Sequence, residues 1–244
     1  MNKHVVTLNV NNWASPNAIA SQRAAAERWG AEYHEFTKPW CIGTDSADVF
    51  AAKFDLGDLP FEQPCRVVWL DADVMVRIDC PSLFDAVPVG TFGGVLNDQG
   101  YEGQDQCARD WWERTVDVLN VGVIIGADSY PVEYSQAMYV NGGVLVFDLP
   151  AHEPIFATSK AKRIRADRTV NPMLEQTLLN IWLRLFADQT ILPATYNRLG
   201  KEAWLSGPAM TSYVYHLANL GELCGDKRGK LEVIDWRILP KLTG

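Results

Sequence analysis

Two aspartates, Asp71 and Asp73, directly follow a short apolar segment at residues 66–70, RVVWL. The β-branched and aromatic residues of this segment predict a buried strand, and on extended backbone two residues that are two positions apart share one face. Both carboxylates are therefore expected to point the same way, and such a pair resists ionising together. A divalent cation removes that cost. The segment predicts a metal site at the ligand-binding edge of an α/β sheet, with a solvated turn as the alternative.

His216 is the best candidate for a third metal ligand. It lies in an apolar, strand-like run, YVYHLANL, far from the aspartates in sequence. The alternative is a hydrogen-bonded core histidine, which is the commoner role of a single histidine in a strand. His4 and His34 fall in predicted strands, and His152 is expected to open an exposed helix. An imidazole that joins two carboxylates favours Mn²⁺ over Mg²⁺.

Asn141, Gly142 and Gly143 interrupt a second apolar run at residues 139–148, YVNGGVLVFD. Asn-Gly between apolar segments is a hairpin signal. The functional interpretation is that two glycines let the backbone approach a ligand closely while Asn141 hydrogen-bonds it. The sequence leaves both interpretations open.

Four further polar residues have a functional and an ordinary interpretation. Glu175 and Gln176 fall in the first turns of a helix that begins at Pro172, where an acid is favoured by the helix dipole or could point into a cleft. Lys53 lies on a predicted helix at residues 47–56, where a solvated lysine is the usual expectation. Asp98 lies in a polar, Gly-rich loop at residues 97–106 that is expected to cover the site.

The segments around these residues predict one α/β domain. Residues 4–10 read as a strand, and a helix follows with Ser15 as N-cap, Pro16 in its first turn and Gly30 after its end. Residues 31–36 return to a strand pattern, and this βαβ opening implies a parallel sheet. Further predicted helices are 81–85, 107–119, 152–165 and the one that Asn171 caps, and further strands are 91–96, 190–192 and 213–217.

The bulk composition excludes several classes of protein. The chain has 244 residues, 48% hydrophobic, and a net charge of −8, which disfavours a protein that grips nucleic acid through its phosphates. The five cysteines are scattered without a C-x-x-C pair, as buried thiols in a reducing compartment are. The N-terminus lacks the pattern of a signal peptide, and no apolar run approaches the roughly 18 residues of a membrane span. We expect a soluble, cytoplasmic protein; the basic cluster at Lys227, Arg228 and Lys230 also allows peripheral contact with an anionic membrane.

Taken in order, these segments resemble the family 8-type glycosyltransferases of the GT-A fold, the group that includes glycogenin and the bacterial lipopolysaccharide galactosyltransferases. TLNVNNWA resembles their nucleotide-binding first strand, and AAKFDLGDLPFEQPCRVVWLDADV resembles their lysine helix followed by the metal-binding D-x-D. YVNGGVLVFD is similar to their N-[SA]-G-V segment and LEQTLLN to their D-Q-x-x-L-N. LPATYNRL is similar to their L-P-x-x-[WY]-N and VYHLAN to their H-F-x-G. The matches are collinear from about residue 5 to residue 219.

The resemblance implies a role for each matching residue. It implies a single GT-A domain over residues 1–244, Rossmann-like with a mostly parallel sheet flanked by helices. The donor-binding part would be about 1–96, the acceptor side about 97–220 and a C-terminal tail 221–244. Mn²⁺ or Mg²⁺ would be held by Asp71, Asp73 and His216. The donor, expected to be a UDP-sugar, would contact Leu8, Val10, Asn11, Trp13, Lys53, Ala72, Asp98, Asn141, Gly142, Gly143 and Lys227. Gln176, Glu175 and Lys53 would be catalytic.

The implied reaction is metal-dependent transfer of the sugar, with retention of configuration, to a hydroxyl of a glycan or small molecule. The sequence departs from the family pattern in having Glu175 before Gln176 in place of Asp, and Gly142 in the N-[SA]-G segment. Lys227 is only a distant counterpart of the family's lysine after the metal histidine. Glu175 is open to two roles, nucleophile or electrostatic stabiliser.

Two other functions compete with sugar transfer. A sugar-1-phosphate nucleotidyltransferase also places acids on a doubly wound sheet, but it usually carries a Gly-rich basic loop after the first strand, and NVNNWASPN has neither Gly nor Lys nor Arg. A non-catalytic nucleotide-sugar-binding protein would bind the donor without turnover. A nucleic acid acceptor is disfavoured by the net charge. The sequence does not define the sugar, the base, the acceptor or the oligomeric state.

Overall fold

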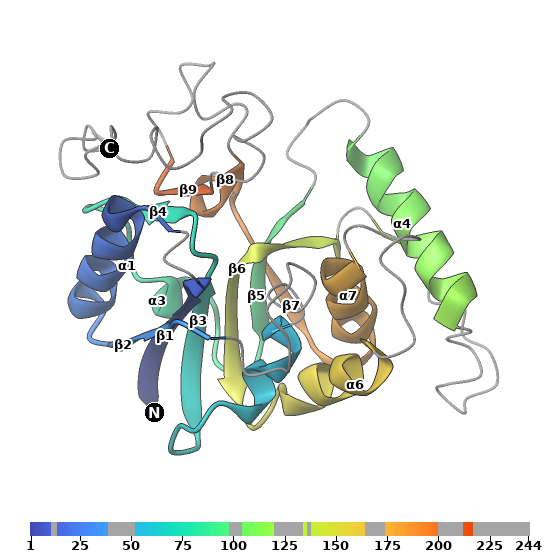
Figure 1. The fold of residues 1–244 in the computed structure, drawn as a ribbon, viewed down its shortest axis with the longest axis horizontal. Coiled ribbons are helices and arrows are strands. Elements are labelled where there is room, and N and C mark those ends of the chain that lie inside the picture. The colour runs from blue at the N-terminus through green and yellow to red at the C-terminus, as the bar shows by residue number, and fades with distance from the viewer. Residues whose placement is uncertain are drawn as a thin grey trace.

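The computed structural model describes residues 1–10, 14–38, 52–97, 104–119, 134–135, 138–163, 174–199 and 212–216, and its centre is a six-stranded sheet (Figure 1). The strands are β1 (Asn2–Leu8), β2 (Glu32–Phe36), β3 (Cys65–Leu70), β5 (Phe92–Leu96), β6 (Val140–Leu149) and β7 (Gln189–Leu192), in the order β2-β1-β3-β6-β5-β7. The pairs β1–β2, β1–β3 and β5–β7 are parallel, whereas β6 is antiparallel to both β3 and β5. The predicted mostly parallel α/β sheet is confirmed.

Helices cover both faces of this sheet. On one face α1 (Pro16–Arg28) and α3 (Leu83–Ala86) pack against apolar side chains that include Val68 and Leu70. The alternate residues of β3, Val67 and Trp69, point to the opposite face, which is covered by η2 (Ala52–Asp58), α6 (Glu153–Arg163) and α7 (Leu174–Phe186). α4 (Gln104–Leu119) packs against α7 on the outside. Both faces of β3 are buried, as expected for a central strand of such a sheet.

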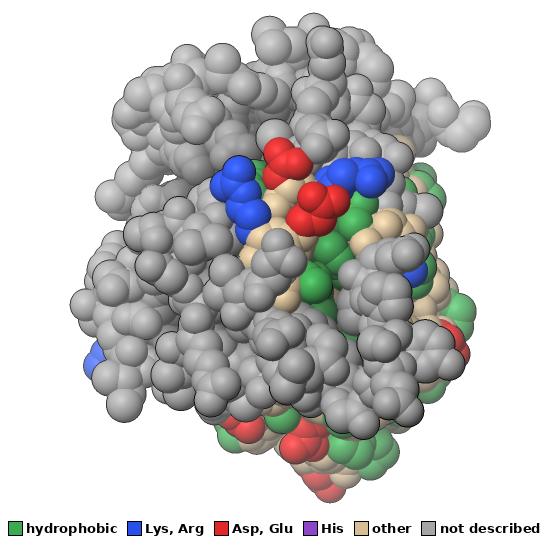
Figure 2. Space-filling view, turned by 90° about the vertical axis from the view of Figure 1, so that its right-hand side faces the viewer, with side chains coloured by type: hydrophobic (Ala, Val, Ile, Leu, Met, Phe, Trp, Pro, Cys, Tyr) green, Lys and Arg blue, Asp and Glu red, His purple; other side chains and the backbone are tan. Residues whose placement is uncertain are grey.

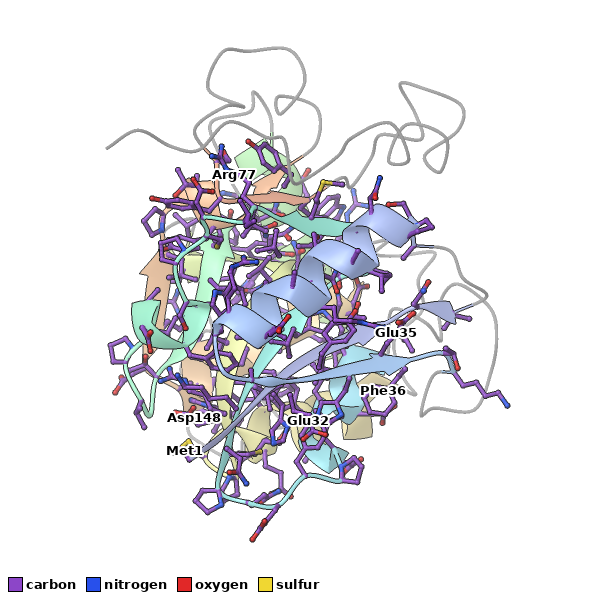
Figure 3. All side chains as sticks on the ribbon, turned by 90° about the vertical axis from the view of Figure 1, so that its left-hand side faces the viewer. Met1, Glu32, Glu35, Phe36, Arg77 and Asp148 are labelled. Carbon is purple, nitrogen blue, oxygen red and sulfur yellow. The ribbon has the colours of Figure 1, made fainter. Side chains whose placement is uncertain are left out.

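The sequence signals for α1 are confirmed. The Ser15 hydroxyl accepts a hydrogen bond from the main-chain N–H of Ala18 at 3.1 Å, Pro16 is the first helical residue, and Gly30 takes a left-handed φ of +65° just after the end. The face of α1 toward the sheet carries small residues, among them the fully buried Ala18 and Ala25. Figure 3 shows α1 lying across the sheet on this side.

A smaller, three-stranded sheet lies beside the carboxyl ends of β1 and β3 (Figure 1). It consists of β4 (Val74–Val76), β9 (Val214–His216) and β8 (Arg198–Leu199), in the order β4-β9-β8. The predicted strand at residues 213–217 is confirmed as β9, while β4 and β8 are too short for a periodic pattern to predict. Antiparallel pairing sets His216 opposite Val74. The end of the described chain is thereby brought next to Asp73.

Several predicted boundaries differ from the structure. β1 ends at Leu8 and not at Val10, because the Asn9 side-chain oxygen accepts from the N–H of Ala14 at 2.9 Å and turns the chain. The described part of the predicted helix 47–56 is the 3₁₀ helix η2, and its predicted cap, Ser46, lies outside the described residues. α4 begins at Gln104, inside the loop predicted for residues 97–106. The predicted helix start at Asn171 and Pro172 also lies outside the described residues.

The structure decides between the two interpretations left open for Asn141 and Gly142: both lie within the ten-residue strand β6, so they do not form a hairpin turn. One further prediction is wrong. His152 is not exposed: it is 2% accessible, its Nδ1 accepts from the N–H of Asp148 at 2.9 Å, and it meets the edge of the Phe92 ring. Within the part of the chain that the structure describes, no helix has the length and apolarity needed to cross a membrane.

A buried ion pair ties the carboxyl end of β6 to the start of β3. Arg66 Nε lies 3.2 Å from Asp148 Oδ1, and both side chains are at most 5% accessible. Asp148 also accepts from the N–H of Gly90 at 2.6 Å. Figure 3 places Asp148 near Met1, at the end of the sheet opposite Arg77. Removing one charge of such a pair leaves the other buried and uncompensated.

We predict that Asp148→Asn lowers the free energy of unfolding by about 3 kcal/mol, because the Arg66 guanidinium would lose its buried counter-charge. The matched control is Asp85→Asn, which removes a carboxylate that is 75% accessible and 3.6 Å from Lys3; that change should cost less than about 1 kcal/mol. Urea unfolding of both variants measures the difference. Equal, small losses of unfolding free energy in the two variants would show that the buried ion pair stabilises the fold no more than the exposed one.

Candidate active site

The segment after β3 is a tight turn. The N–H of Val74 donates to the carbonyl of Asp71 at 2.9 Å, so the two aspartates do not lie on extended backbone as the sequence analysis expected. The side chain of Gln22, which is fully buried on α1, holds this turn by donating to the carbonyls of Asp71 at 3.0 Å and of Val74 at 2.8 Å. The turn, and not strand alternation, brings Asp71 and Asp73 together.

His216 from β9 completes a group of three metal-type side chains. Its Nε2 lies 3.3 Å from Asp73 Oδ1 and 3.7 Å from Asp71 Oδ2, and the residue is 4% exposed. One donor atom from each of the three residues lies within 4.8 Å of the others. Two carboxylates and one imidazole form a donor set that suits Mn²⁺. The structure thus brings the three predicted ligands close enough to hold a single divalent cation.

Asp71 has two more partners, Lys53 and Trp69, and only Lys53 was among the candidate residues in the sequence. Lys53 Nζ lies 2.9 Å and 3.0 Å from the two carboxylate oxygens, and the indole N–H of Trp69 donates to Oδ1 at 2.7 Å. Lys53 is 7% exposed, so its interpretation as a solvated helix lysine is wrong. Trp69 was missed because an aromatic residue in an apolar strand reads as core. Lys53 thus places one positive charge beside Asp71.

Gly143 allows His216 to approach the strand β6. A Cβ atom at position 143 would lie 2.2 Å from His216 Cε1, a distance that no real side chain tolerates. The carbonyl of Gly143 also accepts from the N–H of Asp71 at 2.9 Å. A Cβ at Gly142 would lie 3.1 Å from Lys53 Nζ and 3.8 Å from Gln176 Oε1, with no atom of His216 among its nearest neighbours. The glycines therefore provide close packing around the acids and the histidine, as their functional interpretation expected.

Side-chain amides form a buried network next to this group. Asn141 Nδ2 donates to Asn97 Oδ1 at 3.1 Å and to Gln176 Oε1 at 3.3 Å. Gln176 Oε1 also accepts from the N–H of Gly142 at 3.0 Å, and Gln176 Nε2 donates to Asn97 Oδ1 at 3.0 Å. Asn97 was not singled out from the sequence, because a polar residue after a strand carries no distinctive signal. Both ends of the Gln176 amide are held, so its orientation is fixed.

Two more asparagines attach neighbouring elements to this network. Asn180, one turn after Gln176 on α7, donates to the carbonyls of Val140 and Gln176 and accepts from the N–H of Val140, at 2.7 to 2.8 Å. Asn197 Nδ2 donates to Asn141 Oδ1 at 2.9 Å. Asn197 belongs to the LPATYN motif, which is the sequence signal that points to it. Glu175 is 7% exposed at the start of α7.

The other predicted site residues fall into two groups. Leu8 is buried at the end of β1, Val10 is half-buried beyond it, and Ala72 lies in the turn between the aspartates. These residues lie at the carboxyl end of β1 or β3, which are adjacent and parallel. Asn11, Trp13, Asp98 and Lys227 lie outside the described residues.

Comparison with known proteins connects this geometry to a fold. No known family profile and no curated protein matches the sequence, whereas solved structures match over most of the chain. A glycosyltransferase involved in the glycosylation of the major capsid of PBCV-1 is 12% identical, with a TM-score of 0.59 over 95% of this chain and 98% of that chain. The galactosyltransferase LgtC, in complex with donor and acceptor sugar analogs, is 14% identical, with a TM-score of 0.54 over 89% and 88%. The chain has the GT-A glycosyltransferase fold.

Other similar structures belong to longer chains. GlyE of Streptococcus pneumoniae is 12% identical with a TM-score of 0.53. The match covers 97% of the present chain and 61% of the GlyE chain. The bifunctional glycosyltransferase WbbM gives a TM-score of 0.54 at 14% identity, over 46% of that chain. The fold resemblance drawn from the order of the sequence motifs is confirmed by these structures.

We predict that Gly143→Ala lowers the affinity for Mn²⁺ by about 10- to 100-fold, the range seen when the orientation of a metal ligand is disturbed, because the added methyl group must displace His216. Gly142→Ala is the matched control, since its methyl group would contact Lys53 and Gln176 and not His216, and its affinity should change less than about threefold. Loss of the Mn²⁺ electron paramagnetic resonance signal on binding measures both. Unchanged affinity in Gly143→Ala would show that His216 does not need its present position to bind the ion.

Proposed function

We propose that the protein transfers a sugar from a nucleoside diphosphate sugar, with a UDP-sugar as the expected donor, to a hydroxyl group of a glycan or small molecule. Mn²⁺ or Mg²⁺ would be held by Asp71, Asp73 and His216. One observation carries this proposal: two carboxylates at the end of β3 and an imidazole from β9 meet at the ligand-binding edge of a fold that is shared with glycosyltransferases. The donor would lie across that edge.

The nucleoside would lie beyond β1. Because β1 and β3 are adjacent and parallel, residues that follow β1 emerge beside the Asp71 turn, and Leu8, Val10, Asn11 and Trp13 are proposed to receive the base and ribose. Asn9 fixes the start of this segment: its N–H donates to the carbonyl of Phe36 at 2.7 Å and its side chain donates to Glu35 at 2.8 Å. These two hydrogen bonds would thus fix the backbone at the start of the proposed nucleoside-binding segment.

The diphosphate would lie at the group of acids. When bound there, a divalent cation would hold the donor diphosphate and neutralise charge on the departing nucleoside diphosphate. Lys53, whose ammonium group is 2.9 Å from Asp71, is placed to add a second positive charge beside the leaving group. Such fixed charges act strongly where water is excluded, and Lys53, Asp73 and His216 are all at least nine-tenths buried.

The transferred sugar would lie against Asn141, Gly142, Gly143 and the start of α7. The Gln176 oxygen already accepts two hydrogen bonds, which reduces its nucleophilicity, so we assign Gln176 to stabilising positive charge at the sugar carbon. Retention of configuration would then follow from attack on the same face as the leaving group. Glu175, next in the chain, would act either as a second stabiliser or as a nucleophile.

The acceptor would approach from the side of α4. Figure 2 faces this side and shows basic and acidic side chains interspersed beside a strip of hydrophobic ones. Among the described residues of α4, Arg109, Glu113 and Arg114 are exposed, and Arg109 lies 5.2 Å from the centre of the Tyr134 ring. Mixed charge beside apolar surface suits a sugar acceptor better than a polyanion.

We predict that Asp73→Asn lowers the rate of nucleoside diphosphate release from the best UDP-sugar, with Mn²⁺ present, by at least about 100-fold, equal to about 2.7 kcal/mol of transition-state stabilisation. The exposed-acid variant Asp85→Asn is the control and should keep the wild-type rate. Cleavage at the wild-type rate by Asp73→Asn would refute the metal assignment. Pyrophosphate formed from sugar 1-phosphate and a nucleoside triphosphate would instead indicate a nucleotidyltransferase, and donor binding without turnover a binding protein.

Lys53→Met should change two properties in opposite directions. Removing the ammonium group breaks its contacts with both oxygens of Asp71 and removes a like charge from the cation site. Mn²⁺ affinity without donor should therefore rise by about tenfold, or about 1.4 kcal/mol. Donor turnover should fall, because a positive charge at the leaving phosphate is lost. Titration calorimetry and a turnover assay measure the two effects, with the surface variant Lys3→Met as control. A parallel fall in metal affinity and turnover would contradict this role for Lys53.

A further inference from the structure

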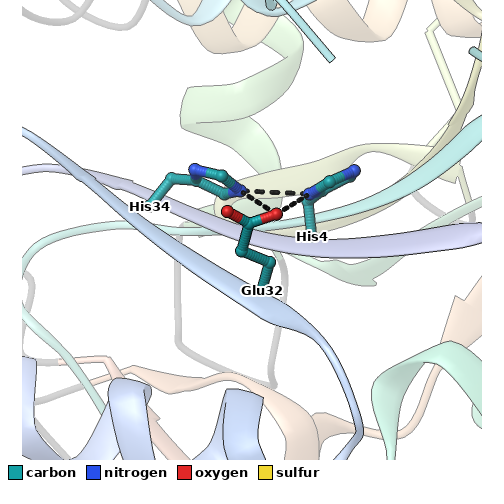
Figure 4. Close-up of side chains that lie close together, drawn as sticks. All are labelled: His4, Glu32 and His34. Atoms are coloured by element: carbon teal, nitrogen blue, oxygen red, sulfur yellow. Dashed lines mark hydrogen bonds and ion pairs between the residues drawn. The ribbon is translucent and has the colours of Figure 1, made fainter. Parts of the chain in front are cut away.

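A second group of potential metal ligands lies on the two neighbouring strands β1 and β2. It consists of His4, Glu32 and His34 (Figure 4). His4 Nδ1 lies 3.0 Å from His34 Nε2, and each of these nitrogens lies 3.7 Å from Glu32 Oε2. Three donor atoms from three side chains therefore surround one point at the edge of the main sheet.

The strand pairing places these residues on one face. His4 is the register partner of Glu32 in the parallel β1–β2 pair, and His34 lies two positions after Glu32 on the same strand. Side chains two apart in a strand share a face, so the histidine of β1 meets both residues of β2. Phe61 stacks on the His4 ring at 4.1 Å and lies 4.4 Å from the His34 ring, which limits the orientations of both imidazoles.

The distances match those of a zinc site. Zinc ligands at about 2.0–2.1 Å in a tetrahedral arrangement lie about 3.3 Å from one another, and the three separations here are 3.0, 3.7 and 3.7 Å. Two histidines and one glutamate form a known type of three-ligand zinc site, with the fourth position left to water. The Glu32 side chain is 69% accessible, so an ion can enter from solvent.

The same three separations have a second explanation that needs no ion. The alternative is a simple hydrogen bond between two neutral imidazoles, beside a surface acid.

This group is separate from the Asp71 site. His4 pairs with Val67 of β3, and Asp71 lies four residues further along the chain, about 13 Å at the rise of a strand. Figure 3 shows Glu32 toward the end of the sheet that carries Met1, away from Arg77 and the smaller sheet. A cation at this group would contact neither Asp73 nor His216.

We propose that His4, Glu32 and His34 bind Zn²⁺ as a second metal site that clamps the edge strand β2 to β1. The order β2-β1-β3 leaves β2 with one partner in the main sheet as described. An ion that joins the side chains of both strands binds only their paired, native arrangement, and a ligand of the native state stabilises it. The same clamp holds Glu35 of β2 beside Asn9.

The test uses the full chain without a histidine tag, in a His216→Ala background that disables the other candidate metal site. Calorimetric titration with Zn²⁺ should give one bound ion, and Zn²⁺ should raise the melting temperature. His34→Gln in that background should weaken binding by about 100-fold, since a direct ligand matters at least as much as the groups that orient it. Glu32→Gln, a change at an accessible side chain, should weaken it by about tenfold.

Glu27→Gln is the matched control, because it removes an exposed acid of α1 away from the group, and it should leave Zn²⁺ binding unchanged. Nitrogen chemical shifts of the His4 and His34 rings should move on Zn²⁺ addition, which a merely structural histidine pair would not show. No bound Zn²⁺ in the His216→Ala protein, or binding that neither His34→Gln nor Glu32→Gln weakens, would overturn the proposal.

Discussion

Electrostatic repulsion between Asp71 and Asp73 is the constraint around which the described site is arranged. One lysine, one indole N–H and one imidazole surround the two carboxylates, and the largely buried surroundings of the acids make uncompensated charge costly. Gln22 holds the turn that carries both acids, and Gly143 leaves the space that His216 fills. Each of these features is explained if a cation completes the charge balance. The same three groups that compensate the acids are those that a bound cation would contact or displace.

The direction of β6 determines what surrounds the acids. If β6 ran parallel to β3, its first residues would lie at the opposite edge of the sheet. Because it is antiparallel, Leu70 pairs with Val144, and Asn141 to Gly143 begin where β3 ends. Asn180 then attaches α7 to the same point through the backbone of Val140, which positions Gln176. A single reversed strand therefore brings the amide network to the acids, and the short strands β4 and β9 bring the histidine.

The sequence predicted those features that depend on neighbours in the chain. Ser15, Pro16 and Gly30 marked α1 because capping is local, and paired acids after an apolar run marked the end of β3. The sequence did not predict the tight turn at residues 71–74, because a side chain on α1 holds it from 49 residues away. His152 was expected to be exposed because its packing against Phe92 is a tertiary contact. The ordinary interpretation of Lys53 as a solvated lysine fails for the same reason, since its partner Asp71 is 18 residues away in the chain. His216 was found only as a candidate, and its match to a family motif linked it to the acids.

The most direct test of this account is a crystal structure of the protein grown with Mn²⁺, using the anomalous scattering of manganese to locate the ion. The account predicts a single strong peak about 2.1–2.3 Å from an oxygen of Asp71, an oxygen of Asp73 and Nε2 of His216, with the Lys53 ammonium displaced from at least one oxygen of Asp71. A saturated crystal in which manganese lies elsewhere, while Lys53 still bridges both oxygens of Asp71, would contradict it.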